Sequence, residues 1–149
     1  MVRLVVYGAF GWCMEILWTA SYALVTGVRG DLGGDSGQLK LSREQRLRLL
    51  GHTYVWMFPL YGAGGLLFEP IHEAIRGWPW LGRGALWMVL IFVVEYVAGA
   101  ALCRLTGRCP WDYSYSRYHL HGLIRFDYMP VWFLFGLVLE RFHDAVAAM

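Results

Sequence analysis

Four glutamates stand within or beside long apolar stretches of this chain, where an ionised side chain is costly. They are Glu15, Glu69, Glu95 and Glu140. An ionised acid at the centre of a membrane-spanning helix costs roughly 2.5–3.5 kcal/mol on insertion scales. Four such acids predict side chains that face inward, toward one another, toward cations or toward water. The alternative for each acid is a neutral carboxyl group that is hydrogen-bonded to a neighbouring helix and serves packing alone.

Helical spacing assigns three of these acids to one site. At a rise of about 1.5 Å per residue, Glu15, Glu95 and Glu140 are expected at similar depths, with Glu69 shallower. We therefore expect Glu15, Glu95 and Glu140 to form a buried carboxylate site that binds cations, protons or a cationic headgroup.

Two of the acids also belong to a repeated Glu-x-x-His pattern, Glu69–His72 and Glu140–His143. Residues three apart share a helix face, and mixed carboxylate and imidazole ligands suit iron, manganese or zinc. Two such motifs plus one glutamate from each of two other helices form the ligand set of ferritin-like di-metal bundles. Pro70 within one motif and the unequal depths count against this interpretation. The alternative metal site comprises Glu15, Glu69, His72, Glu95, Glu140 and His143.

An aromatic segment after the third apolar stretch is the other dense feature of the sequence. Non-helical backbone near a membrane is tolerated only where it packs on protein or lines a wet cavity. We expect this segment to fold back onto the mouth of a helical bundle, as a gate or a rim that contacts headgroups. The alternative is an aromatic belt at the membrane interface. Its candidate binding residues are Trp111, Asp112, Tyr113, Ser114, Arg117 and His121.

The composition favours a membrane protein. The chain has 149 residues, the size of one domain. Hydrophobic residues make up 58% and charged residues 16%, against roughly 45–50% and 25% in soluble domains. A soluble fold of this size still exposes about 30% of its unfolded surface, so lipid must solvate the apolar excess. The net charge of +2 excludes a nucleic-acid-binding surface, and three cysteines without paired spacing predict no disulfide framework.

About 20 apolar residues are needed to cross a bilayer as a helix. The sequence predicts an all-α polytopic fold in one transmembrane domain, residues 1–149, with spans at about 3–25, 52–69, 84–105 and 128–147. A capping box at Ser42–Gln45 predicts a short amphipathic helix at the interface. Small residues on the first two spans predict close helix packing, and these are Gly8, Gly11, Gly62, Gly64 and Gly65.

Charge in the loops predicts the orientation. With four spans, the first and third loops carry nine basic residues, and the opposite side carries four. By the positive-inside rule the nine-charge side is cytoplasmic, and both termini lie outside. We expect an integral protein of a bacterial inner membrane.

Several short blocks of sequence together resemble a known family. The chain resembles the CmpB-type ABC-transporter permease family in four places. These are Gly11-Trp12 followed by Glu15, the block Pro59–Gly62, Glu95, and the block Trp111–Ser114 followed by Gly122. The transmembrane protein 229 family, its eukaryotic relatives, is similar in the Cys109–Ser114 block, Gly122–Ile124, and Trp132-Phe133 with Glu140. The likeness runs from about Gly8 to Phe142, and it implies a permease subunit.

The chain departs from this family before the Pro-x-Tyr-Gly motif. Many members carry Asn-Arg-Gly and Gly-Pro elements there, whereas this chain has Gly51-His52 and Trp56–Phe58. The sequence has no phosphate-binding Gly-rich loop with a lysine, so any ATPase would be a separate chain.

The favoured function is that of a small permease-like or lipid- or ion-handling membrane subunit. Membrane lipids are its expected surroundings, and it is expected to work as a homo-oligomer or in a larger membrane complex, because four helices enclose little volume. The alternative is a membrane-embedded enzyme, with a di-metal carboxylate centre, that acts on a lipid or isoprenoid. A third alternative is an assembly factor without a small-molecule site. The sequence leaves the choice between transport and catalysis open, and it names no cofactor.

Overall fold

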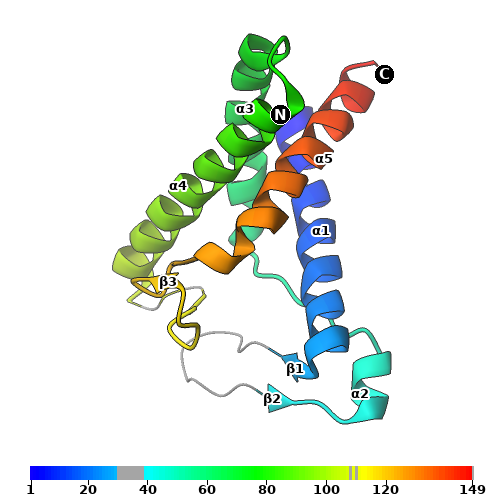
Figure 1. The fold of residues 1–149 in the computed structure, drawn as a ribbon, viewed down its shortest axis with the longest axis vertical. Helices are drawn as coiled ribbons and strands as arrows, with labels where there is room; N and C mark the ends of the chain where they lie inside the picture. The colour runs from blue at the N-terminus through cyan, green and yellow to red at the C-terminus, as the bar shows by residue number, and fades with distance from the viewer. Residues whose placement is uncertain (30–38, 108, 110, 149) are drawn as a thin grey trace. The chain divides into compact units, whose positions relative to one another are not determined.

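The computed structural model describes residues 1–29, 39–107, 109 and 111–148. The chain is mostly helical and divides into two compact units (Figure 1). The first unit comprises Met1–Leu66 with Arg108–Trp111, and the second comprises Leu67–Gly107 with Asp112–Met149. Helix α3 (Met57–Ile75) contributes its N-terminal half to the first unit and its C-terminal half to the second.

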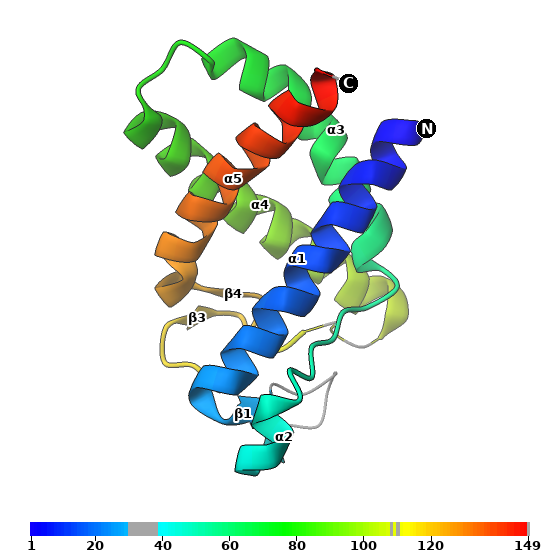
Figure 2. The same ribbon diagram turned by 90° about the vertical axis from the view of Figure 1, so that its right-hand side faces the viewer.

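The first unit is built on one long helix. Helix α1 (Val2–Thr26) ends at Gly27, whose φ of 70° is the left-handed conformation that commonly terminates helices. It is followed by a two-stranded ladder of β1 (Val28–Arg29) and β2 (Leu39–Lys40) and by helix α2 (Arg43–Leu47). Both α2 and the ladder lie at the C-terminal end of α1 (Figure 2).

The predicted capping box is confirmed. The hydroxyl of Ser42 accepts from the backbone of Gln45, and the side chain of Gln45 accepts from the backbone of Ser42. In the same segment Arg46 donates hydrogen bonds to the carbonyl oxygens of Leu24 and Val25. Those carbonyls belong to the last turn of α1, so Arg46 supplies partners that a helix end otherwise lacks.

Glycines allow α1 to pack closely on the first half of α3. A Cβ on Gly11 would lie 2.1 Å from Cγ of Tyr61, and one on Gly65 would lie 2.2 Å from Cγ of Tyr7. Among the described residues, nothing lies within 4 Å of a Cβ on Gly64. The predicted close approach is therefore present at Gly8, Gly11, Gly62 and Gly65, and Gly64 takes no part in it.

The second unit joins the end of α3 to two further helices. After α4 (Trp80–Thr106) the chain forms a small ladder of β3 (His119–Leu120) and β4 (Ile124–Arg125), and then the 3₁₀ turn η1 (Phe126–Tyr128) leads into α5 (Met129–Ala147). Helices α4 and α5 pack against each other (Figure 1). A Cβ on Gly136 would lie 2.2 Å from Cβ of Trp87, and Trp87 stacks on Phe68 with ring centroids 4.2 Å apart.

The structure corrects the predicted number of spans. Among the described residues, two helices are long and apolar enough to cross a bilayer, α1 and α4. Helices α3 and α5 have 19 residues each, and their second halves carry several ionisable groups. Four crossings are therefore not supported, because the spans expected at 52–69 and 128–147 run into charged sequence. The charged and histidine residues are Glu69, His72, Glu73, Glu140, Arg141, His143 and Asp144.

Two smaller predictions also need correction. The fold is not purely α-helical, because two short antiparallel ladders flank the helices. Cys103 and Cys109 are disulfide-bonded, although the cysteine spacing predicted no disulfide framework. Cys13 is a free, exposed thiol.

Candidate functional site

The two Glu-x-x-His motifs meet in the second unit, and they pair crosswise. Nδ1 of His72 on α3 lies 3.5 Å from Oε1 of Glu140 on α5. Nδ1 of His143 on α5 lies 4.0 Å from Oε1 of Glu69 on α3. The centroids of the two imidazole rings are 5.2 Å apart, with the rings inclined at 75°. Each motif therefore places its acid beside the histidine of the other helix.

Glu140 is held by two donors from α4. It is 4% exposed. Nε of Arg83 lies 3.1 Å from its Oε2, and the indole of Trp87 donates to its Oε1 over 2.8 Å. Arg83 also donates to the backbone carbonyls of Arg76 and Trp78. The buried carboxylate thus has a fixed counter-charge, which a charge in the protein interior requires.

Three exposed or half-exposed side chains, Glu73, Arg76 and Asp144, lie beside the histidines. Nη2 of Arg76 lies 2.7 Å from Oε1 of Glu73 and 2.8 Å from Oδ1 of Asp144. Nε2 of His72 lies 3.2 Å from the same Asp144 oxygen, and Nε2 of His143 lies 3.7 Å from Oε1 of Glu73. The hydrogen bond from Arg76 holds the pKa of the Glu73 carboxyl below its usual range.

Sequence reasoning missed the groups that surround the motifs. A signal was present, because each Glu-x-x-His is followed directly by a further acid, Glu73 in one case and Asp144 in the other. A five-residue pattern of this kind, occurring twice, places two acids and one histidine on each helix. No sequence pattern singled out Arg76, Arg83 or Trp87, which lie on or before a different helix.

Glu95 lies at a different level of α4 and contacts the aromatic segment. The hydroxyl of Tyr113 donates to its Oε1 over 3.1 Å, and the hydroxyl of Tyr96 lies 2.9 Å from Nδ1 of His121. The segment therefore folds back onto α4, as predicted. Glu95 is eight residues beyond Trp87, roughly 12 Å along the helix. The expected similar level of Glu95 and Glu140 is thus wrong.

The aromatic segment holds its own shape. Asp112 accepts hydrogen bonds from the backbone and the hydroxyl of Ser114. A Cβ on Gly122 would lie 2.8 Å from the Asp112 carboxylate, and its φ of 71° favours glycine. Trp111 is half-buried, and Arg117 is exposed with its guanidinium 5.2 Å from the centre of the Tyr118 ring.

A buried arginine organises the end of this segment, and no sequence pattern points to it. Arg125 is 7% exposed. It pairs with Asp127, donates to the hydroxyls of Tyr115 and Tyr128, and lies 4.4 Å from the centre of the Tyr128 ring. Burial, together with the nearby Glu95 carboxylate, raises the pKa of the Tyr113 phenol well above its usual value. Tyr113 therefore remains a hydrogen-bond donor at neutral pH.

Glu15 belongs to the first unit. The hydroxyl of Thr53 donates to its Oε2 over 2.7 Å, and Tyr61 supplies a further side-chain hydrogen bond. Nearby, Thr19 accepts from the backbone of His52 and donates to the His52 carbonyl. Within the described part of the chain, no ion pair involves Glu15, so neutral hydroxyl groups alone solvate its carboxylate.

The six-residue metal set assembles only in part. Glu69, His72, Glu140 and His143 come together between α3 and α5. Glu95 lies further along α4 with Tyr113, and Glu15 lies in the first unit.

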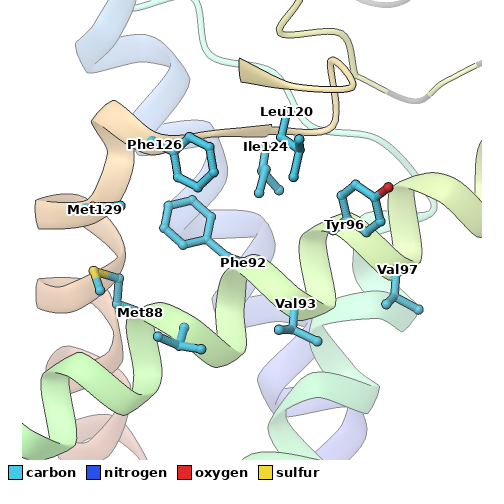
Figure 3. Close-up of a pocket in the computed structure, with 10 residues that line it drawn as sticks. Met88, Phe92, Val93, Tyr96, Val97, Leu120, Ile124, Phe126 and Met129 are labelled. Carbon is cyan, nitrogen blue, oxygen red and sulfur yellow. The ribbon is translucent and has the colours of Figure 1, made fainter. Parts of the chain in front are cut away.

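A separate hollow in the second unit has an apolar lining. Its volume is about 400 Å³, and the rings of Phe92 and Phe126 lie next to each other in its lining, with centroids 5.9 Å apart and planes inclined at 58° (Figure 3). The hydroxyl of Tyr96 is the polar group drawn at its edge. The hollow offers no acid, base or ligand group, so it contributes shape rather than chemistry. The lining residues are Met88, Val89, Phe92, Val93, Tyr96, Val97, Leu120, Ile124, Phe126 and Met129.

Comparison with known proteins agrees with the sequence blocks. No solved structure matches this chain. A family model matches residues 2–148, almost the whole sequence. The chain belongs to the CmpB family, described as "Putative ABC-transporter type IV".

Proposed function

We propose that the chain is a permease-like membrane subunit in which α1 and α4 cross the bilayer, and in which Glu15 and Glu95 bind protons or monovalent cations. Family membership and the two apolar helices support a membrane protein. Val89, Val93 and Val97 form a stripe along α4, with 51%, 52% and 60% of each residue exposed. A continuous apolar stripe of this kind is unusual in water, whereas lipid solvates it without cost.

The observation that carries this proposal is the environment of Glu15. It is the fourteenth residue of the 25-residue helix α1, close to the middle of the apolar stretch. Its described partners, Thr53 and Tyr61, are neutral. A carboxylate at this depth is stabilised by a proton or a cation far more than by hydroxyl groups. Glu15 therefore has the chemistry of a site that takes up and releases a positive charge.

Glu140 serves as the contrast within the same chain. Its charge is paired with the guanidinium of Arg83, and its other oxygen accepts a hydrogen bond from the indole of Trp87. A carboxylate with a built-in counter-ion has little to gain from a mobile cation. We therefore assign Glu140 to the framework and leave it outside the transport path.

Glu95 is the second acid of the proposal, and Tyr113 is its gate. Glu95 is the sixteenth residue of the 27-residue helix α4, again near the middle. Since the Tyr113 hydroxyl donates to it, movement of residues 112–122 would expose or cover the carboxylate. This segment, with Asp112, Ser114, Arg117 and His121, is the proposed rim.

An oligomeric assembly is part of the proposal, and ion flux through the chain itself needs no ATPase. The assignment of both termini to the outside depends on the loop charges of four crossings, which the structure does not support.

Ion flux through the reconstituted protein tests this function. The purified full chain is placed in liposomes that contain a dye sensitive to protons, sodium or potassium, and a gradient of the same ion is applied. Wild-type protein is expected to dissipate at least one gradient faster than empty liposomes. Glu15→Gln and Glu95→Gln should each slow this flux at least tenfold while the helical circular dichroism is kept.

The matched control is Glu44→Gln, because Glu44 forms an exposed pair with Arg48 at 2.6 Å and lies outside the apolar helices. This variant should conduct at the wild-type rate. Wild-type flux in both Glu15→Gln and Glu95→Gln, or no flux of any of the three ions through the wild type, would refute the proposal.

A further inference from the structure

The two histidines of the second unit present their outer ring nitrogens to acids. Nε2 of His72 lies 3.2 Å from Oδ1 of Asp144, and Nε2 of His143 lies 3.7 Å from Oε1 of Glu73. His72, Glu73 and His143 can each offer one ligand atom so that all three atoms lie within 4.8 Å of one another. Two ligand atoms on one tetrahedral zinc ion are roughly 3.3–3.5 Å apart. These three residues thus need only a small closing movement to hold one ion, whereas Asp144, which lies near His72 but outside this group, must move further to become the fourth ligand.

A second observation concerns the inner ring nitrogens. Histidines that bind metals almost always give their other N–H to a carboxylate, a carbonyl or a water molecule. Here Nδ1 of His72 faces Glu140 at 3.5 Å, and Nδ1 of His143 faces Glu69 at 4.0 Å. In the described part of the chain, the buried Nδ1 of His72 makes no hydrogen bond at normal distance. Both imidazoles therefore stand between an inner and an outer acid.

The inner acid of His72 is itself rigid. Arg83 and Trp87 fix both oxygens of Glu140, and His72 stacks on Phe68 with ring centroids 5.3 Å apart. A ligand whose ring plane is set in this way loses little entropy when it binds.

We propose that His72, His143, Glu73 and Asp144 form a mononuclear site for a divalent transition-metal ion of the zinc class, with Glu140 and Glu69 orienting the two imidazoles. Two imidazole nitrogens and two carboxylate oxygens form a donor set that suits zinc, cobalt or iron. The site differs from a ferritin-like centre, because the glutamates of the two motifs lie behind the histidines instead of binding the metal. It goes beyond the proposed function, since it does not depend on ion flux.

Arg76 forms hydrogen bonds with Glu73 and Asp144, the two acids that face the outer ring nitrogens of the histidines. Its guanidinium lies within 2.8 Å of both Glu73 and Asp144. Its side chain is 48% exposed, so it can turn toward solvent when a metal ion takes over the two carboxylates. The arginine therefore competes with the metal and limits its affinity.

Zinc binding by variants of the full chain tests the site. All proteins carry Cys13→Ser, because the exposed thiol of Cys13 could bind zinc by itself. The purified proteins are titrated with zinc in detergent, and cobalt absorption reports the coordination number. The parent protein should bind one zinc ion per chain. His143→Ala and His72→Ala should weaken binding at least 100-fold, and the control His119→Ala, on the exposed strand β3, should not.

Arg76→Met keeps the proposal testable if a histidine variant fails to fold. Removal of the competing guanidinium should tighten zinc binding about tenfold, and cobalt should give the intense absorption of a four-coordinate site. The proposal is overturned if neither the parent nor Arg76→Met binds zinc stoichiometrically. It is also overturned if folded His72→Ala and His143→Ala both bind zinc as the parent does.

Discussion

Glu140 and Glu15 differ in the groups that surround their carboxylates. This difference assigns Glu140 to the stability of the fold and Glu15 to the binding of a cation. Glu140 has an arginine and an indole at hydrogen-bonding distance, whereas Glu15 has hydroxyl groups. Since a buried ion pair is costly to break, Glu140 should act on stability. A carboxylate among neutral groups is stabilised when it binds a cation. Changes at Glu15 should therefore alter ion flux.

Neutralising Glu140 should destabilise the second unit. Glu140→Gln removes the charge that Arg83 faces, and Arg83 is only 20% exposed. Breaking a buried pair in this way costs about 3 kcal/mol, which thermal unfolding in detergent would detect. Glu44→Gln disrupts a well-exposed pair and should change the midpoint little. Equal midpoints for Glu140→Gln and wild type would show that the pair with Arg83 is not part of the framework.

Asp127 should give the aromatic segment a stability that depends on acid pH. Its hydrogen bond from Arg125 lowers the pKa of the carboxyl below its usual 3.8. A lowered folded pKa contributes stability above the unfolded value, and this contribution is lost as the pH falls through the folded pKa. Between pH 5 and pH 2.5 the unfolding midpoint should fall more steeply for wild type than for Asp127→Asn. Parallel curves would argue against a stabilising pair.

At the scale of elements, the contact of α1 with the first half of α3 depends on particular glycines. A Cβ on Gly65 would meet the ring of Tyr7 at 2.2 Å. Gly65→Ala should therefore lower the unfolding free energy by about 1–3 kcal/mol, the usual cost of overpacking. Gly64→Ala is the matched control one residue away, with nothing described within 4 Å, and it should be neutral or slightly stabilising. The reverse order of the two variants would refute this helix contact.

Local patterns predicted local structure well. The capping box at Ser42 and the apolar stretches of α1 and α4 appear where the sequence placed them, because hydrogen bonding and hydropathy act over a few residues. The spans predicted over α3 and α5 are not supported, because the charged residues near the ends of these helices form ion pairs and His–carboxylate contacts with other helices and loops.

Partners from distant elements could not be predicted. Glu140 pairs with Arg83, 57 residues away, and Glu15 with Thr53, 38 residues away. The choice of partner depends on how the helices pack in three dimensions. The spacing of residues within one helix carries no information about that packing. That the four acids avoid lipid stays a prediction, which rests on the cost of burying a charge in an apolar stretch.

At the scale of the whole molecule, the acids of this apolar chain lie in two kinds of environment: an ionic cluster, and the middle of long apolar helices. The acids of α3 and α5 face two arginines and two histidines within the second unit. Glu15 and Glu95 stand near the middle of the two helices that are long and apolar enough to cross a bilayer. Under the proposed function, the acids that bind an ion are therefore different residues from the acids that hold the framework.

The modification of Glu15 by carbodiimides in liposomes tests this arrangement most directly. A hydrophobic carbodiimide modifies protonated carboxyl groups in apolar surroundings, and a charged, water-soluble one modifies those in water. Peptide mass spectrometry then compares Glu15 with the exposed Glu44. We predict that the hydrophobic reagent modifies Glu15 and abolishes flux, and that the water-soluble reagent modifies Glu44. Modification of Glu15 by the water-soluble reagent alone, as for Glu44, would contradict its place in a membrane-spanning helix.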